Sequence, residues 1–201
     1  VAAVPDAILA EGVNVTQSVD LNGARIGGSV RIDGAEVGKA FRADGIEIQG
    51  GATAIAADVA RIGGNWSLAG ARLVGVVSLA GADINGQLAL KDARLYGTED
   101  ALRADGARIR GGCYLSRAVV FGSLRFPAAE IGNQLKLKGA TVKVDRGAAL
   151  FASGVRIGRD VDLGGLETIG GVVLDQARIP GALDLSGSHI VSTALAQTTP
   201  Q

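Results

Sequence analysis

Several residue types are scarce or absent in this sequence of 201 residues. It contains no methionine, one cysteine and four prolines, and aromatic residues make up 3% of it. A single cysteine excludes an internal disulfide framework and a metal site built from cysteines, and it is compatible with a reducing cytoplasm, where we expect the protein to be located. The lack of methionine, including at position 1, predicts that the sequence is a segment of a longer chain.

An excess of charge of one sign and long apolar runs are also missing. Lysine plus arginine and aspartate plus glutamate each number 20. The protein therefore has no net field that would attract nucleic acid, and we predict no nucleic-acid partner. No apolar stretch is long enough to span a bilayer, and the first residues lack the basic-then-apolar order of a signal peptide. No transmembrane segment is predicted.

Glycine is abundant instead, with 31 residues, about twice the usual share of roughly 7%. The glycines follow an eleven-residue unit, A-x-I-x-G-x-L-x-L-x-G, whose places one, three, seven and nine are apolar. Alternation of apolar and polar places is typical of strands with one buried face, and glycines suit the corners between them. Fifteen units begin at Val13, Ala24, Ala35, Ile46, Ala60, Ala71, Ala82, Ala93, Ala107, Ala118, Ala129, Ala140, Val155, Leu166 and Ala177.

Two units, each with two short strands, are expected to close one four-sided coil of about 22 residues. Successive coils would stack through parallel hydrogen bonds at about 4.8 Å and wind in the right-handed sense. The predicted fold is all-β, a right-handed parallel β-helix or quadrilateral solenoid. Residues 1–12 would form a partial N-terminal coil, residues 13–187 a single solenoid, and residues 188–201 a frayed last coil with a polar tail. A leucine-rich repeat is the rival, but it needs a helical return in each repeat.

A super-repeat of 47 residues lies over the shorter period. Four related phrases end at Gly12, Val59, Gly106 and Gly154, which are 47, 47 and 48 residues apart. The lengthened units contain the extra segments "QGGATA", "YGTEDA" and "KVDRGAA", and all three fall in even-numbered units. We therefore expect these segments to protrude at one corner of every second coil.

The phrases "ARIGG", "ADING" and "ARLYG" resemble the unit of pentapeptide-repeat proteins, whose family fold is a right-handed quadrilateral β-helix. The longer pattern, "ALRADGARIRGG" through "AAEIGNQLKLKGA", is similar to a bacterial, mainly actinobacterial, group of pentapeptide-like proteins often catalogued as oxidoreductases. Some pentapeptide-repeat proteins bind topoisomerases by imitating DNA, so the resemblance brings in that function as an alternative. Such mimicry requires a strongly acidic surface, and the balanced charge of this chain argues against it.

A search for catalytic groups gives few candidates. Cys113 occupies the inward place seven, which predicts an inert core thiol. His189, the only histidine, has an outward place in the frayed last unit and is interpreted as a solvated side chain. Asp160, Asp162 and Asp184 could lie close enough for glycoside hydrolysis, but solvated outward columns are the favoured interpretation. No glycine-rich stretch meets the dinucleotide-binding pattern, so we predict no catalytic residue, no cofactor and no metal site.

The outward places predict columns of charge along the rod. Place two of the odd-numbered units gives a column in which the signs mostly alternate: Asn14, Glu36, Arg61, Asp83, Arg108, Glu130, Arg156 and Arg178. In the even-numbered units, places two and eight put Arg72, Arg94, Arg103 and Arg125 into a predicted basic patch midway along the rod. An anionic partner is the functional interpretation of this patch, and a solvated, solubilising face is the alternative. Trp66 has the inward place seven, and either the coil widens around it or the register slips and its ring lies outside.

The expected function is a non-catalytic scaffold or protein-interaction module that presents flat faces and periodic corner loops to a protein partner. One alternative is a topoisomerase-binding DNA mimic of the pentapeptide-repeat type. A second is an oxidoreductase or a carbohydrate-active β-helix enzyme. The end coils carry unpaired strand edges, which allow end-to-end or homodimer association.

Overall fold

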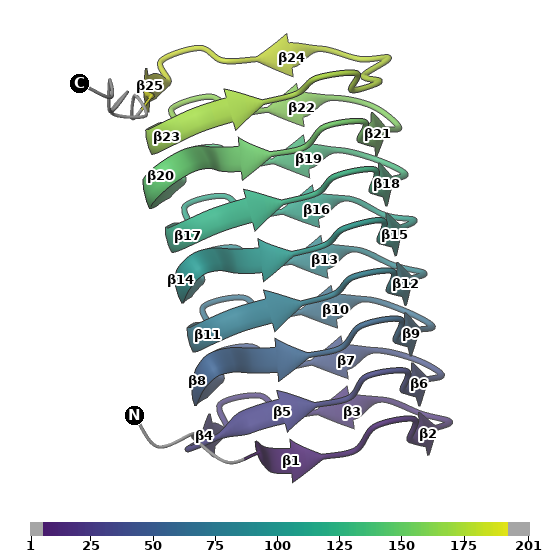
Figure 1. Ribbon diagram of the computed structural model, residues 1–201. Helices are drawn as coiled ribbons and strands as arrows, with labels where there is room; N and C mark the ends of the chain where they lie inside the picture. Colours follow the sequence, from purple (N-terminus) through teal and green to yellow (C-terminus); the bar gives the residue numbers. More distant parts are fainter. Residues whose placement is uncertain (1–5, 193–201) are drawn as a thin grey trace, which may run out of the picture.

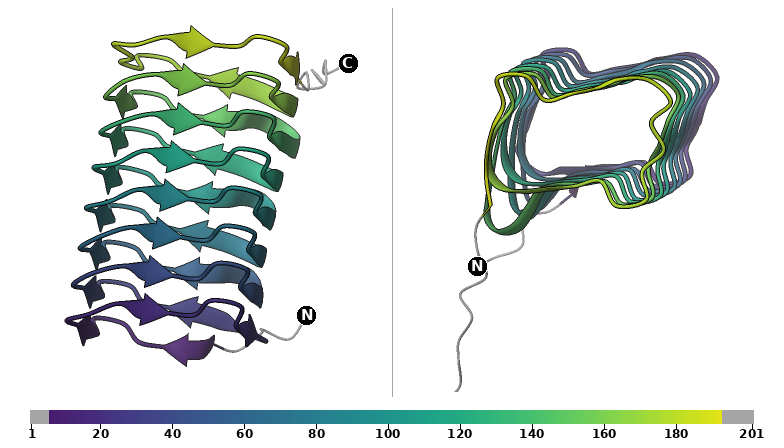
Figure 2. Two further views of the ribbon diagram at one scale, coloured as in Figure 1. Left: turned by 180° about the vertical axis from the view of Figure 1, so that it is seen from behind. Right: turned by 90° about the horizontal axis from the view of Figure 1, so that it is seen from above.

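The eleven-residue period becomes a stack of parallel β-coils (Figure 1). The structure, a computed structural model, describes residues 6–192, and this range contains strands and turns but no helix. The strands nearest the viewer run left to right as the chain climbs from its N-terminus, so the winding is right-handed. Seen along the axis, each coil has four sides (Figure 2). The predicted right-handed parallel solenoid with about 22 residues per coil is confirmed, and the stack makes about eight turns.

The odd-numbered units form two of the three sheets, and each of their strands is two residues long. Places two and three form a seven-stranded sheet, and places seven and eight form an eight-stranded sheet. The strands of the seven-stranded sheet are β2 (Asn14–Val15), β6 (Glu36–Val37), β9 (Arg61–Ile62), β12 (Asp83–Ile84), β15 (Arg108–Ile109), β18 (Glu130–Ile131) and β21 (Arg156–Ile157). Those of the eight-stranded sheet are β3 (Val19–Asp20), β7 (Phe41–Arg42), β10 (Trp66–Ser67), β13 (Leu88–Ala89), β16 (Cys113–Tyr114), β19 (Leu135–Lys136), β22 (Val161–Asp162) and β24 (Leu183–Asp184).

The even-numbered units form the third sheet, the long sheet, and they differ from the prediction of two short strands per unit. The two strands stay separate only in the first of these units, β4 (Arg25–Ile26) and β5 (Ser29–Arg31). In the following units they join into one strand that bends around a corner. The other strands of the long sheet are β1 (Asp6–Leu9), β8 (Glu47–Ala56), β11 (Arg72–Ser78), β14 (Arg94–Arg103), β17 (Val119–Arg125), β20 (Thr141–Phe151), β23 (Glu167–Val173) and β25 (His189–Val191).

Glycine explains why these strands bend without breaking. Gly75, at the bend of β11, has a φ of 114°, a backbone conformation that side chains other than hydrogen rarely allow. The long sheet therefore covers two of the four sides of the coil. We call the part of each strand before the bend the first arm (residues 72–74 in β11) and the part after it the second arm (residues 76–78).

The extra residues of the super-repeat lie at this same bend. Gln49 of β8 pairs with Val74 of β11, and Thr53 pairs with Val76, so residues 50–52 lie opposite Gly75 alone. β14 and β20 show similar shifts of register. The view along the axis shows the protrusion at one corner of the rod (Figure 2). The predicted corner loops on every second coil are confirmed, and we call them the corner bulges.

The inward places fill the interior with aliphatic side chains and alanine. Trp66 also lies in this interior: its side chain is fully buried, and its ring centroid lies 4.7 Å from that of Phe41 in the coil below. The ring therefore lies inside, which answers the question left open by the sequence. Its indole nitrogen is buried without a hydrogen-bond partner. Cys113, two coils above in the same sheet, is also fully buried, as predicted.

Each eleven-residue unit closes on a residue with positive φ. Glycine takes most of these places, but five of them hold residues with a side chain in the same left-handed conformation. The winding of the coil therefore imposes the conformation, and the residue type only sets its cost. The five are Val59, Asp92, Arg117, Ala128 and Gln176, with φ between 52° and 59°.

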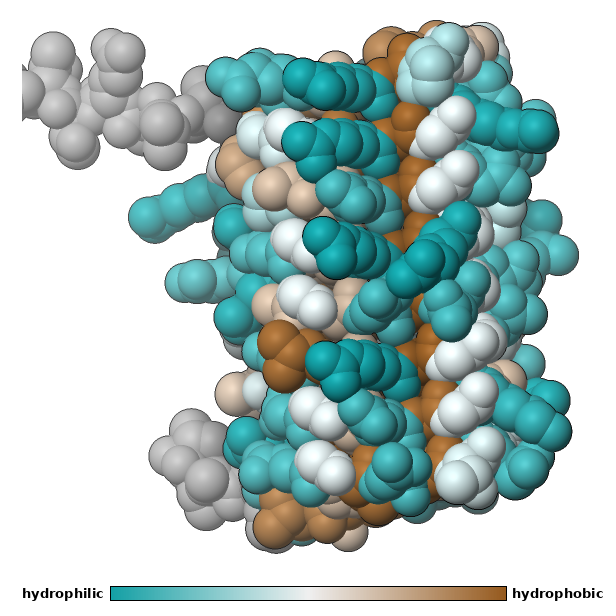
Figure 3. All heavy atoms as spheres, turned by 90° about the vertical axis from the view of Figure 1, so that its right-hand side faces the viewer, coloured by the Kyte–Doolittle hydropathy of each residue, from teal (hydrophilic) through white to brown (hydrophobic). Residues whose placement is uncertain are grey.

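The charged column predicted for the odd-numbered units runs along the seven-stranded sheet, which Figure 3 shows face on. Each member pairs in register with the next, from Asn14 to Arg178. Arg61 lies 2.6 Å from Glu36, and Arg156 lies 2.7 Å from Glu130. Exposed pairs of this kind contribute only a few tenths of a kcal/mol each, on the order of 0.2–1. Their main effect is to favour this register over a shifted one.

The first and last strands of the described chain pair with the long sheet. β1 pairs with β5, and β25 pairs with β23, so residues 6–9 and 189–191 are parts of coils. Residues 193–201, most of the predicted polar tail, lie outside the described range. Leu183 and Val191 are exposed because no described coil lies above them. The described residues include no helix that could cross a bilayer.

Candidate functional site

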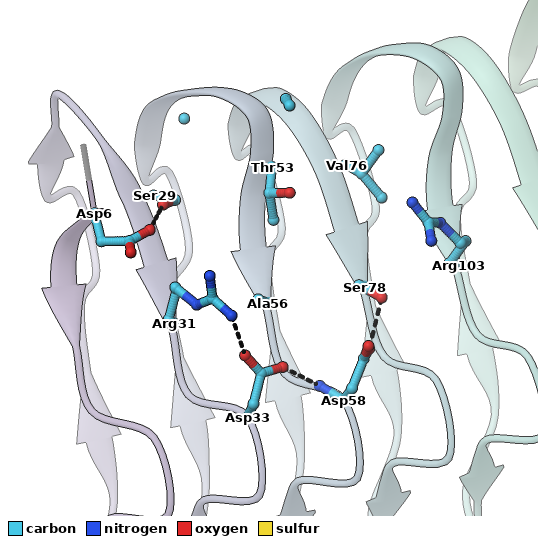
Figure 4. A pocket seen from close by; sticks show the side chains of 12 residues that line it. Asp6, Ser29, Arg31, Asp33, Thr53, Ala56, Asp58, Val76, Ser78 and Arg103 are labelled. Carbon is cyan, nitrogen blue, oxygen red and sulfur yellow. Dashed lines mark hydrogen bonds and ion pairs between the residues drawn. The ribbon is translucent and has the colours of Figure 1, made fainter. Parts of the chain in front are cut away.

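Two polar hollows lie on the second arm of the long sheet, beside the corner bulges. The first has a volume of about 380 Å³ and extends from Asp6 of β1 to Arg103 of β14 (Figure 4). The second has a volume of about 520 Å³ and lies over β17, between the bulges of β14 and β20. Both hollows exist because alternate strands carry the extra residues and the strands between them do not. They are the natural candidates for a binding site.

The first hollow contains a basic group that carboxylates neutralise. The Arg31 guanidinium lies 3.0 Å from Glu11 and 3.4 Å from Asp33. These carboxylates, Glu11 above all, raise the pKa of Arg31, so the side chain stays cationic. Asp33 also accepts a hydrogen bond of 2.9 Å from the backbone N–H of Asp58. This side of the hollow is therefore a paired network.

The other polar groups of the first hollow are bonded in the same way. The Ser78 hydroxyl donates to Asp58 at 2.5 Å, and the same carboxylate oxygen accepts from the Ala80 N–H at 3.0 Å. The Ser29 hydroxyl donates to Asp6. Figure 4 shows the bonds of Asp6, Asp33 and Asp58 following one another along successive coils. They link neighbouring coils, and their first role is to hold the coils in register.

The charged residues that line the second hollow are Arg125, Arg146, Glu99, Asp100 and Asp145. Asp100, from the bulge of β14, lies 3.3 Å from Arg103 and 3.9 Å from Arg125. Arg125 also lies 3.4 Å from Asp105, and its guanidinium lies 5.2 Å from the centre of the Phe151 ring. Partial burial raises the pKa of Asp100, although the two arginines act against this shift. The charge of Arg125 is therefore balanced by carboxylates of the chain itself.

The predicted basic patch divides into two pairs. Arg72 and Arg94 are register neighbours on the first arm, and Arg103 and Arg125 are register neighbours on the second arm. Along β14, the bend and the bulge residue Asp100 lie between Arg94 of the first pair and Arg103 of the second. The four arginines thus flank one corner of the rod and do not share one flat face, because each strand bends between its first arm and its second arm.

Two outward aromatic residues on the first arm were not identified from the sequence. Tyr96 of β14 and Phe121 of β17 are register neighbours, and their rings stack with centroids 5.4 Å apart and an interplanar angle of 7°. Arg72 lies over Tyr96 at 4.8 Å and donates a hydrogen bond of 3.1 Å to its hydroxyl. Both rings have place four, in two successive even-numbered units. The 22-residue register that predicted the charged columns therefore also predicts that these two residues are neighbours.

The candidate catalytic groups lie in separate environments. Burial raises the pKa of the Cys113 thiol far above its usual range, so the reactive thiolate is disfavoured. His189 lies on β25 in register with Glu167, and the neighbouring Ser188 donates its hydroxyl to the Leu185 carbonyl at 2.6 Å. That hydroxyl is therefore directed to the backbone and not to the imidazole.

The carboxylates considered for glycoside hydrolysis cap turns. Asp162 and Asp184 are register neighbours, as predicted, and each accepts a backbone N–H two residues later, at 3.1 and 2.8 Å. Asp160 accepts from the Ala182 N–H at 3.0 Å and from Gln134 at 2.6 Å. These hydrogen bonds lower the pKa values of Asp160 and Asp184, whereas a general acid needs a raised one.

No described group of three or more histidine, cysteine, aspartate or glutamate residues is arranged to hold a metal ion. Comparison of the sequence with models of known protein families finds no match. A search of curated proteins finds no match either.

Proposed function

We propose that this solenoid is a non-catalytic interaction scaffold whose one irregular corner binds a protein partner. The observation that carries the proposal is the position of the corner bulges, which within residues 6–192 interrupt the regular coils at a single corner. Both polar hollows, both arginine pairs and the stacked Tyr96 and Phe121 rings adjoin this corner.

The contrast with another side supports this choice. On the seven-stranded sheet, the outward charges pair with one another along the column, as with Arg61 and Glu36. The first arm beside the corner instead exposes Phe121, whose surface is 41% accessible. Exposed aromatic side chains beside arginine are enriched at protein interfaces. The coils bury a continuous apolar interior, which gives such a site a rigid support.

We also propose that the repeat is a variant of the pentapeptide type. The right-handed winding and the four-sided coil support this, and so do the short strands of the odd-numbered units. The difference is that each unit has eleven residues instead of ten. Related sequences in which the two unit lengths occur together would support the link, and relatives that all keep eleven would contradict it.

Site-specific crosslinking tests the scaffold function. A photoreactive amino acid would replace one outward-facing residue at a time, in cells that naturally make the protein. Lys143 and Arg146 probe the first arm and a corner bulge, and Arg108 and Lys136 probe the seven-stranded and eight-stranded sheets. We expect discrete protein adducts from positions 143 and 146 and none from 108 and 136. Equal adducts at all four positions, or none at the corner, would contradict the proposal.

A further inference from the structure

Three side chains on consecutive strands of the first arm form a ladder along the rod. Arg72 of β11 lies over one face of Tyr96 in β14, and Phe121 of β17 stacks against the other face. The register pairs Arg72 with Arg94 and Tyr96 with Phe121, so Arg94 lies directly beside the ladder. We call this stack of three side chains, together with the adjacent Arg94, the first-arm ladder.

This surface is apolar and positively charged: the first arm of β11, β14, β17 and β20 has no acidic residue, and Glu47 of β8 and Glu167 of β23 lie at its two edges. The outward places of the first arm in β11, β14, β17 and β20 contain three cations and no carboxylate. The residues at these outward places are Arg72, Val74, Arg94, Tyr96, Val119, Phe121, Thr141 and Lys143. Away from the end coils, the described chain exposes three large hydrophobic residues, and two of them, Phe121 and Ile169, lie on this arm. An occupant must therefore offer both apolar contact and negative charge.

The two arginine pairs beside the corner differ in how their charge is balanced. Adjacent like charges in a ladder are destabilising unless something neutralises them. Arg103 and Arg125 have Asp100 and Asp105 within 3.3 to 3.9 Å. Within residues 6–192, Arg72 and Arg94 form no ion pair, and Arg72 is held by Tyr96 instead. The first-arm pair thus leaves room for carboxylates supplied by another molecule.

The orientation of the stack decides what kind of contact the occupant makes. Both faces of Tyr96 are covered, one by Arg72 and one by Phe121, so the ladder presents edges to the solvent. Aromatic edges carry partial positive charge, and the edge of a guanidinium carries N–H donors. Carboxylate and carbonyl oxygens suit such edges. A nucleic-acid base, which needs an open ring face, has none at Tyr96.

We propose that the first-arm ladder binds an extended acidic peptide segment of a protein partner. Its carboxylates accept hydrogen bonds from Arg72 and Arg94, and an apolar side chain next to them packs on Phe121. This inference rests on the proposed scaffold function and names the chemistry of the partner. An extended peptide places every second side chain on one face, which allows an acidic and an apolar residue to contact the ladder together.

Fluorescence anisotropy with labelled probes tests the inference on the whole protein. The probe is a decapeptide in which serine alternates with aspartate and leucine, and its control replaces each aspartate with asparagine. We expect the acidic peptide to bind and the asparagine peptide to bind at least tenfold more weakly. Added salt should weaken the acidic complex, since the charges are exposed. Equal binding of the two peptides, or no binding of either, would overturn the inference.

Matched variants locate the site. The double variant Arg72→Gln with Arg94→Gln should weaken the acidic peptide at least tenfold, and so should Phe121→Ser alone. The control, Arg103→Gln with Arg125→Gln, removes the same charge on the other side of the corner and should leave binding within twofold. Circular dichroism checks that each variant is folded. Equal loss in the control and in the ladder variant would overturn the inference.

Two further probes separate other classes of partner. A labelled twelve-residue oligothymidylate that binds more tightly than the acidic peptide would replace the proposed partner with single-stranded nucleic acid, and vesicles containing phosphatidylserine that do so would replace it with a membrane. Either result would overturn the inference. Crosslinks at positions 143 and 146 without binding of the acidic peptide would leave the scaffold function standing and refute only the peptide chemistry.

Discussion

Replacing Val59 with glycine should stabilise this protein, because the backbone at that corner favours a residue without a side chain. Val59 closes a unit with a φ of 53° and is 63% exposed. A β-branched residue in the left-handed region is a clear outlier, since its side chain crowds the backbone. Glycine holds the equivalent place in most other units, for example at Gly45 with a φ of 64°.

The size of the effect follows from three opposing contributions. Relief of the left-handed conformation is worth about 1–2 kcal/mol, at the upper end for a β-branched residue. The greater backbone freedom of glycine in the unfolded chain takes back about 0.4–1 kcal/mol. Loss of the small buried part of the valine side chain costs roughly 0.5 kcal/mol, as most of it is exposed. The net gain for Val59→Gly is therefore about 0.5 kcal/mol, which corresponds to a rise in Tm of roughly 1–2 °C.

Urea unfolding followed by far-UV circular dichroism measures this gain, with two variants as controls. Val59→Ala keeps a side chain in the left-handed conformation and should stabilise less than Val59→Gly. Gly45→Val is the reverse change, and it should destabilise by about 1 kcal/mol through the backbone alone, because a Cβ at Gly45 meets no atom within 4 Å. A lower midpoint for Val59→Gly, or an unchanged midpoint for Gly45→Val, would refute the reasoning.

Three other changes have outcomes that the structure determines. Gly63→Ala should lower the free energy of unfolding by about 1–3 kcal/mol in the same urea assay, because its Cβ would lie 2.1 Å from the Gly38 carbonyl oxygen. Trp66→Ala should cost about 3–5 kcal/mol. Trp66→Phe should cost clearly less, because a phenyl ring still fills most of the space while the buried, unpaired N–H is lost in both variants, and comparison of their melting temperatures decides. Asp160 has a lowered pKa, so it stabilises the fold above about pH 4, the unfolded-state value, and this stabilisation is lost as the pH falls through the folded-state pKa. Asp160→Asn should therefore show a smaller drop in melting temperature between pH 5 and pH 3 than the unchanged protein, and an equal drop would contradict this.

The period of the sequence was sufficient to predict which residues become neighbours between coils. A parallel stack with a fixed number of residues per coil places like positions above one another, so the order of the column from Asn14 to Arg178 could be written down in advance. The same rule placed Cys113 inside and located the corner bulges at the lengthened units. These features depend only on spacing, and spacing is visible in the sequence.

The angle between neighbouring sides of a coil is a different kind of property. Whether two short strands remain separate or join around a bend depends on the backbone conformation at residues such as Gly75, which the repeat pattern does not specify. For that reason the sequence grouped Arg72 with Arg103, and the structure places them on two sides of a corner.

The sequence by itself therefore determined the solenoid, its register and the places where the repeat is interrupted, because all three follow from a regular spacing of apolar residues and glycine. Only the tertiary structure decided that the Trp66 ring lies inside and that Arg72, Tyr96 and Phe121 stack into one outward ladder. Those outcomes depend on the volume available inside a coil and on ring orientation, which packing fixes in three dimensions.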